Sequence, residues 1–136
     1  MKFKQYLINE ILETPYKFKV MKSKDHYVAR FKTEDGKKGM FDAAFLDEMG
    51  LWGIAFTIDG NIEITGKGDA FKIFSTIKYI LLDFINKIKP DSFLFTSKEK
   101  TRNKLYDKFA KMIVNKTQYK KYKTEIGKEK EYIFKK

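Results

Sequence analysis

A glycine-rich turn runs directly into the longest amphipathic pattern of the chain, at residues 65–84 (TGKGDAFKIFSTIKYILLDF). Apolar side chains recur there at helical spacing, namely Ala70, Phe71, Ile73, Phe74, Ile77, Ile80, Leu81 and Phe84. This spacing places them in one stripe along a helix, which we expect to end near Ile88. Because an amphipathic helix has to bury its stripe, we predict that it packs across a sheet formed by the rest of the chain.

Segments with strand-like patterns lie on both sides of that helix. They alternate apolar and polar residues or form short apolar runs, and Asp35-Gly36 and Asp59-Gly60 mark tight turns between them. A second helix is predicted to end near Val114. The predicted strands are residues 16–21, 26–33, 39–45, 51–58, 61–65, 93–96 and 132–134, and the last of them belongs to a closing hairpin. We therefore predict an α+β fold, with a single, mostly antiparallel twisted sheet and two main helices packed on it.

The composition indicates one folded domain at residues 15–136, preceded by a separate segment at residues 1–14. A chain of 136 residues with 43% hydrophobic residues can bury a core of its own. Cysteine is absent and histidine occurs once, which argues against disulfides and against a metal site. Because no apolar run approaches ~20 residues and no secretory signal is present, we expect neither secretion nor a membrane partner.

The positive charge is concentrated near the C-terminus. The chain has a net charge of +11, and residues 97–136 hold 14 Lys or Arg against 5 Asp or Glu. Lysines interleaved with tyrosines can pair with phosphates and stack on bases, so a nucleic acid or an acidic protein is an expected partner. A lysine-rich solvated surface, or a strand edge protected by lysines, would explain the same pattern. The candidate nucleic-acid-binding residues are Lys98, Lys100, Arg102, Lys104, Lys120, Lys121 and Lys123.

The N-terminal segment forms a short amphipathic helix pattern that Thr14-Pro15 ends. It resembles the capsid-targeting N-terminus of internal head proteins in T4-like tailed phages, which ends in a small or aliphatic residue, any residue, and Glu. Residues 8–10 (INE) and 11–13 (ILE) both fit this cleavage pattern. The resemblance implies processing after Glu10 or Glu13, and a location in the virion interior or the host cytoplasm. An ordinary helix that docks on the core is the alternative.

The order of the predicted elements resembles the core of the GCN5-related N-acetyltransferase (GNAT) fold. Residues 65–70 (TGKGDA) stand where that family carries Gln/Arg-x-x-Gly-x-Gly/Ala, and residues 105–109 (LYDKF) where it carries Leu-Tyr-x-Lys-x-Gly-Phe. The resemblance implies a GNAT-like topology, with Tyr106 as the general acid that protonates the departing coenzyme A thiolate. It also implies that acetyl-CoA binds at Gly66, Lys67, Gly68, Asp69 and Ala70.

Two departures from the family pattern weaken the predicted activity. Thr65 replaces a long donor side chain, and Asp69 would place a carboxylate beside a pyrophosphate unless it caps its own helix. Glu63 and His26 are candidate general bases, although a structural or an exposed position is the favoured interpretation of each. Three functions stay open: a phage-type protein that acts by binding, an acyl-CoA-dependent N-acetyltransferase, and a non-enzymatic nucleic-acid-binding protein of low sequence specificity.

Overall fold

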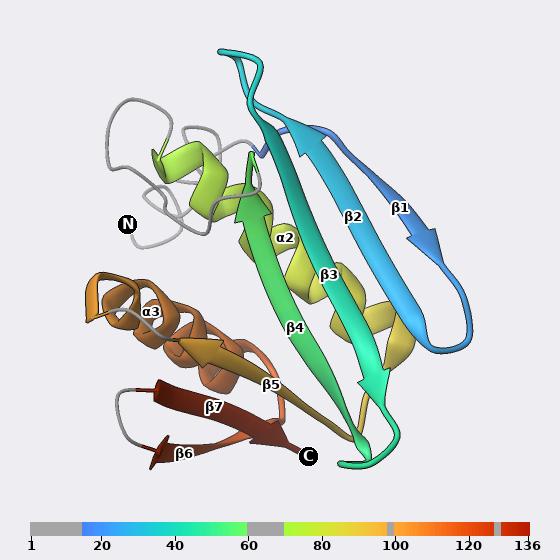
Figure 1. The fold of residues 1–136 in the computed structure, drawn as a ribbon, viewed down its shortest axis with the longest axis vertical. Coiled ribbons are helices and arrows are strands. Elements are labelled where there is room, and N and C mark those ends of the chain that lie inside the picture. Colours follow the sequence, from blue (N-terminus) through green and yellow to red (C-terminus); the bar gives the residue numbers. More distant parts are fainter. Residues whose placement is uncertain (1–14, 60–69, 98–99, 127–128) are drawn as a thin grey trace, which may run out of the picture.

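The computed structural model describes residues 15–59, 70–97, 100–126 and 129–136 (Figure 1). Seven strands and two helices follow one another along these residues. Their bounds are β1 Phe18–Lys22, β2 His26–Lys32, β3 Lys38–Leu46, β4 Leu51–Ile58, α2 Ala70–Ile88, β5 Ser92–Ser97, α3 Lys100–Lys116, β6 Lys120–Ile126 and β7 Glu129–Lys135.

The strands form one mixed sheet in the order β1-β2-β3-β4-β5-β7-β6. All neighbours are antiparallel except β4 and β5, which run parallel and pair at only three positions, from Trp52↔Phe93 to Ile54↔Phe95. Beyond these positions the two strands diverge (Figure 1). The strands β1 and β6 are the two edges of the sheet.

Both described helices lie on the same face of the sheet, behind the strands in Figure 1. The ring of Phe84 on α2 contacts the rings of Tyr27, Phe41, Trp52 and Phe93, which come from four different strands. The ring of Phe109 on α3 contacts Phe56 on β4 and stacks on Phe74 of α2 at 4.6 Å between centroids. We call this side of the sheet the helix face and the opposite side the open face.

The alternation of strand residues explains why the core lies on the helix face. In β2 the side chains of Tyr27, Ala29 and Phe31 are buried, whereas those of His26, Arg30 and Lys32 are exposed. Successive side chains of a strand point to opposite faces, so each strand supplies its apolar set to the core and its polar set to the open face. Burying a large apolar side chain contributes about 1.5–3 kcal/mol, which makes the helix face the main source of stability.

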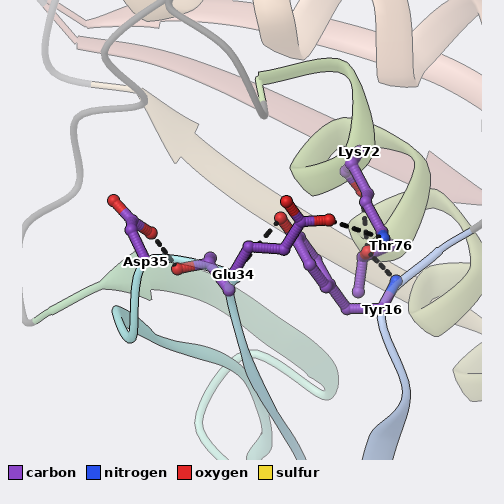
Figure 2. A network of polar contacts seen from close by, with 6 residues as sticks. Tyr16, Glu34, Asp35, Lys72 and Thr76 are labelled. Atoms are coloured by element: carbon purple, nitrogen blue, oxygen red, sulfur yellow. Dashed lines mark hydrogen bonds and ion pairs between the residues drawn. The ribbon is translucent and has the colours of Figure 1, made fainter.

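A polar network fixes the segment that leads into β1 (Figure 2). The backbone amide of Tyr16 donates to Thr76 Oγ1 on α2 at 2.8 Å, and Lys72 Nζ lies 4.4 Å from the centroid of the Tyr16 ring. Lys72 also pairs with Glu34 in the turn after β2, at 3.4 Å between Nζ and Oε1. These contacts tie three separate parts of the chain together, so the position of β1 at the edge of the sheet is well defined.

The turn between β2 and β3 forms at the predicted Asp35-Gly36 pair. Gly36 has a φ of +85°, a region that glycine adopts without strain, and its amide donates to the carbonyl of Thr33 at 3.1 Å. The Thr33 hydroxyl donates to Asp35, which holds the pKa of that carboxyl below its usual range. The predicted hairpin is therefore confirmed at this position.

The predicted fold class is wrong. We expected a mostly antiparallel sheet with two main helices in a GNAT-like topology and a short N-terminal helix. The described residues form a strand-rich, seven-stranded mixed sheet, which differs from the GNAT-like packing of helices. The predicted N-terminal helix falls on residues 1–14, which lie outside the described residues.

The C-terminal strands account for much of this difference. The sequence predicted a closing hairpin whose last strand covers residues 132–134, and β6 and β7 do pair as an antiparallel hairpin, but each of them is seven residues long. Tyr132 and Phe134 supply the buried side of β7, whereas Lys135 is exposed. Lysine-rich segments can therefore form strands here, because an antiparallel strand with one solvated face needs only one apolar side.

Candidate anion-binding site

The open face of β1, β2 and β3 carries a concentration of exposed basic side chains. The strand pairing places Lys19 directly opposite Arg30, and Lys32 directly opposite Lys38. All four side chains are exposed, and none of them forms an ion pair with another described residue. Like charges directly opposite each other across a pair of strands are destabilising, so this arrangement has a cost that the fold alone does not require.

These side chains line a shallow groove of about 730 Å³ on the open face, which we call the basic groove. Its basic lining residues are Lys17, Lys19, Arg30, Lys32 and Lys38. Its apolar lining residues are Val20, Met21, Val28 and Phe31, of which Met21 and Val28 have their side chains on the open face and Val20 and Phe31 on the helix face. No carboxylate lines the groove. An anion placed there would meet several cations at once, above a floor of aliphatic groups.

The described carboxylates near the basic groove are occupied by other partners. Asp42 pairs with His26 on the open face at 2.6 Å, and Asp35 in the turn after β2 pairs with Lys37 at 3.4 Å. Asp59 accepts a hydrogen bond from the backbone amide of Lys38 at 2.8 Å. In the N-terminal half, whose net charge is small, the basic side chains of the groove thus lie apart from the carboxylates.

A second cavity, of about 930 Å³, lies on the helix face between α2, the end of α3 and the start of β1. Three of its polar groups are engaged within the protein: Asp83 accepts from Tyr27 at 2.7 Å, the Tyr119 hydroxyl donates to the carbonyl of Pro90, and Lys136 Nζ donates to the carbonyl of Lys89. Burial raises the pKa of Tyr119 to about 12, and burial with the Asp83 hydrogen bond raises the pKa of Tyr27. Internal hydrogen bonds and buried, neutral tyrosine hydroxyls are typical of groups that stabilise the fold, so this cavity has a structural role.

The predicted C-terminal site is only partly described. Lys120 lies opposite Lys135, and Lys121 lies opposite Phe134 on the helix face, so these two neighbours point to opposite sides of the sheet. The strand does not bring them together on one surface. The side chains of Lys98, Lys100, Arg102, Lys104, Lys123 and of the predicted catalytic Tyr106 lie outside the described residues.

The predicted cofactor loop and processing sites are also outside the described part of the chain. Ala70 is the first residue of α2. Glu10, Glu13, Glu63, Gly66, Lys67, Gly68 and Asp69 belong to the residues that are not described.

The basic groove was not predicted from the sequence, because the excess of positive charge over long segments lies at the C-terminus instead. The signal that could have found it is local: Lys17 and Lys19 alternate with apolar residues in one strand, as do Arg30 and Lys32 in the next. Alternation predicts that such cations share one face of each strand. Only the pairing of the strands shows that they also lie side by side.

Neither a membrane span nor a metal-binding group occurs in the part of the chain that the structure describes. No described helix is long and apolar enough to cross a membrane. Across the same residues, no group of three or more His, Asp or Glu could hold a metal ion. Comparisons with family models, with curated proteins and with solved structures found no match.

Proposed function

We propose that this protein acts by binding an anionic macromolecule, nucleic acid or an acidic protein, in the basic groove. The observation that supports the proposal is that like charges stand at paired positions across β1, β2 and β3, Lys19↔Arg30 and Lys32↔Lys38. A bound anion would relieve the repulsion between these cations and would release their counterions. A stability cost at a surface site is typical of residues kept for binding.

Binding of labelled polymers to a groove variant tests this proposal. The variant Lys19→Ala, Arg30→Ala and Lys38→Ala removes three charges from the basic groove. A matched control, Lys108→Ala, Lys111→Ala and Lys116→Ala, removes three exposed charges from α3. Fluorescence anisotropy is measured with duplex DNA, single-stranded DNA and poly-glutamate between about 50 and about 300 mM salt.

The two variants should behave differently if the groove is the site. We expect the groove variant to bind at least about tenfold more weakly, and the slope of log K against log salt to fall by about 2–3 for nucleic acid. The control should change affinity by less than about threefold, which is the effect of net charge alone. Equal losses in both variants would show that affinity follows net charge, and no binding of any polymer at low salt would end the proposal.

A phage virion or the infected host cytoplasm is the proposed location, as the N-terminal resemblance implies. Mass spectrometry of purified particles should then find the protein beginning at Ile11 or Thr14, after cleavage at Glu10 or Glu13. An intact Met1 in the particles would contradict processing.

The acyl-CoA-dependent activity stays a prediction, because its proposed residues lie outside the described part of the chain. Calorimetric titration with acetyl-CoA tests it directly. Micromolar binding would favour an N-acetyltransferase over the binding function, and no heat or thermal shift at millimolar acetyl-CoA would remove the enzyme from consideration.

A further inference from the structure

We propose that the occupant of the basic groove is an acidic, aliphatic peptide segment that pairs with β1 as an additional strand of the sheet. This inference rests on the proposed function and names the partner of the same site. It follows from where the groove lies, from the pattern of side chains along β1, and from the chemistry of the groove floor.

The groove lies at an edge of the sheet. Among the described residues, the strand β1 is the first in the sheet order and pairs only with β2 (Figure 1). Lys19 and Met21 of β1, and Lys17 just before it, line the groove. An extended peptide beside β1 would therefore gain backbone hydrogen bonds and reach these side chains together, as in recognition by strand addition.

The side chains of β1 specify the pattern of the added strand. Residues that project onto the open face would lie beside Lys17, Lys19 and Met21 in turn, so two acidic side chains and one aliphatic side chain fit there. Residues that project onto the helix face would lie beside Phe18 and Val20, which are half-buried and pack against the core. Read beside β1 from Lys17 to Met21, the complementary strand therefore carries an acidic, an aliphatic, an acidic and two aliphatic residues in turn.

Both faces of this edge have room for such side chains. On the open face, Met21 is 67% exposed and lies opposite Val28, and Arg30 Nη1 lies 4.0 Å from Met21 Sδ. On the helix face, Phe18 and Pro15 line the second cavity. Aliphatic side chains of the added strand would contact apolar groups on the open face and on the helix face. Its acidic side chains would meet Lys17 and Lys19 on the open face.

The floor of the groove favours a peptide over nucleic acid. Its one aromatic lining residue, Phe31, is 6% exposed and stacks on Tyr16 on the helix face. Sequence-independent binding of single strands depends on aromatic rings on which bases stack. Tyr122 is 50% exposed, but it lies on β6 at the other edge of the sheet. Aliphatic floor groups flanked by cations complement aliphatic and acidic side chains instead.

The test uses the full chain and a fluorescent peptide that contains Glu-Val-Glu-Ile-Val between glycine-serine flanks. One control peptide has the same composition in the order Glu-Glu-Val-Ile-Val. Two further peptides carry N-methyl groups on alternate amides, one set along each edge of the strand. Oligo-thymidine serves as the nucleic-acid probe, and exchange of the β1 amides is followed with and without peptide.

Strand addition predicts a distinct set of results. The alternating peptide should bind about tenfold more tightly than the reordered one. One N-methylated peptide should bind about tenfold more weakly and the other should keep its affinity, since only one edge of the added strand pairs with β1. Alternate amides within Phe18–Lys22 should exchange more slowly when the peptide is bound. Lys19→Ala with Arg30→Ala should weaken binding about tenfold.

Other outcomes overturn the inference. Equal binding of both peptide orders, or equal loss with both N-methylated peptides, would mean charge attraction without strand pairing. Tighter binding of oligo-thymidine, lost with the same two substitutions, would make nucleic acid the occupant and leave the proposed function standing. No binding of peptide, poly-glutamate or nucleic acid would overturn the proposed function itself.

Discussion

The two faces of the sheet come from the same strands but obey different constraints. On the helix face, the buried residues of β2 and β3 pack against Phe84, so their size and shape decide whether the protein folds. On the open face, the alternate residues of the same strands place Lys19 opposite Arg30 and Lys32 opposite Lys38. The residues of the helix face therefore stabilise the fold, whereas the like charges on the open face lower its stability.

The same substitution on each face provides the strongest test of this contrast. A Cβ at Gly39 would lie 2.2 Å from Cζ of the buried Phe31, whereas a Cβ at Gly53 on the open face would lie 2.9 Å from the mobile end of the exposed Leu46 side chain. We expect Gly39→Ala to lower the free energy of unfolding by about 1–3 kcal/mol, because the core is overpacked there. Gly53→Ala should change it by less than about 0.5 kcal/mol, because Leu46 can rotate away.

Urea denaturation of both variants measures these changes. Combining Gly39→Ala with Phe31→Leu should recover part of the loss, since the smaller side chain leaves room for the methyl group. Equal costs at Gly39 and Gly53 would remove the distinction between the two faces.

The helix face was the more predictable of the two. The apolar period of α2 can be read from the sequence because burial selects residue types, and the continuous apolar run at Leu51–Ile58 similarly predicted β4. The short apolar run at residues 93–96 likewise predicted a strand, and β5 forms there beside β4. A segment that packs in the core can thus be recognised from its own apolar pattern in the sequence.

The open face left a weaker signal. Its residues are polar in any fold, so their types do not show which strands will be neighbours. The contact between Lys19 and Arg30 depends on the register of β1 against β2, which hydrophobic pattern alone does not determine for charged positions. For the same reason the bounds of the lysine-rich β6 were not predicted, although a closing hairpin was expected, and the candidate site was placed at the C-terminus instead of on β1, β2 and β3.

Alkaline pH should weaken the helix face through its buried tyrosines. Burial raises the pKa of Tyr119 to about 12, against about 10 in an unfolded chain, so the folded state favours the neutral hydroxyl. This contribution is present below about pH 10 and is lost as the pH rises toward about 12, because the unfolded chain ionises first. Tyr27, whose pKa is also raised, adds to the loss in the same direction.

Thermal unfolding followed across this range, with tyrosinate absorbance as a second signal, measures the effect. Tyr119→Phe should lower stability at neutral pH by about 0.5–1.5 kcal/mol, because the hydrogen bond to the Pro90 carbonyl is lost. It should also flatten the decline above about pH 10. An unchanged decline in this variant would mean that Tyr119 does not contribute to it.

Charge reversal on the open face should produce the smallest change in stability, and in the opposite direction. Lys32→Glu replaces a repulsive pair with Lys38 by an attractive one, so we expect the free energy of unfolding to rise by about 0.2–1 kcal/mol. Binding of poly-glutamate should weaken in the same variant, because the basic groove gains a carboxylate. Lys121→Glu, opposite Phe134 on the helix face, is the control and should give no such gain.

A rise in stability together with a loss of binding would identify Lys32 as a residue whose charge is retained at the expense of the fold. Calorimetric melting and anisotropy on the same preparations distinguish the possible results. A lower melting temperature for Lys32→Glu would mean that the repulsion across β2 and β3 is screened by solvent. Relief of that repulsion would then no longer favour an anionic occupant.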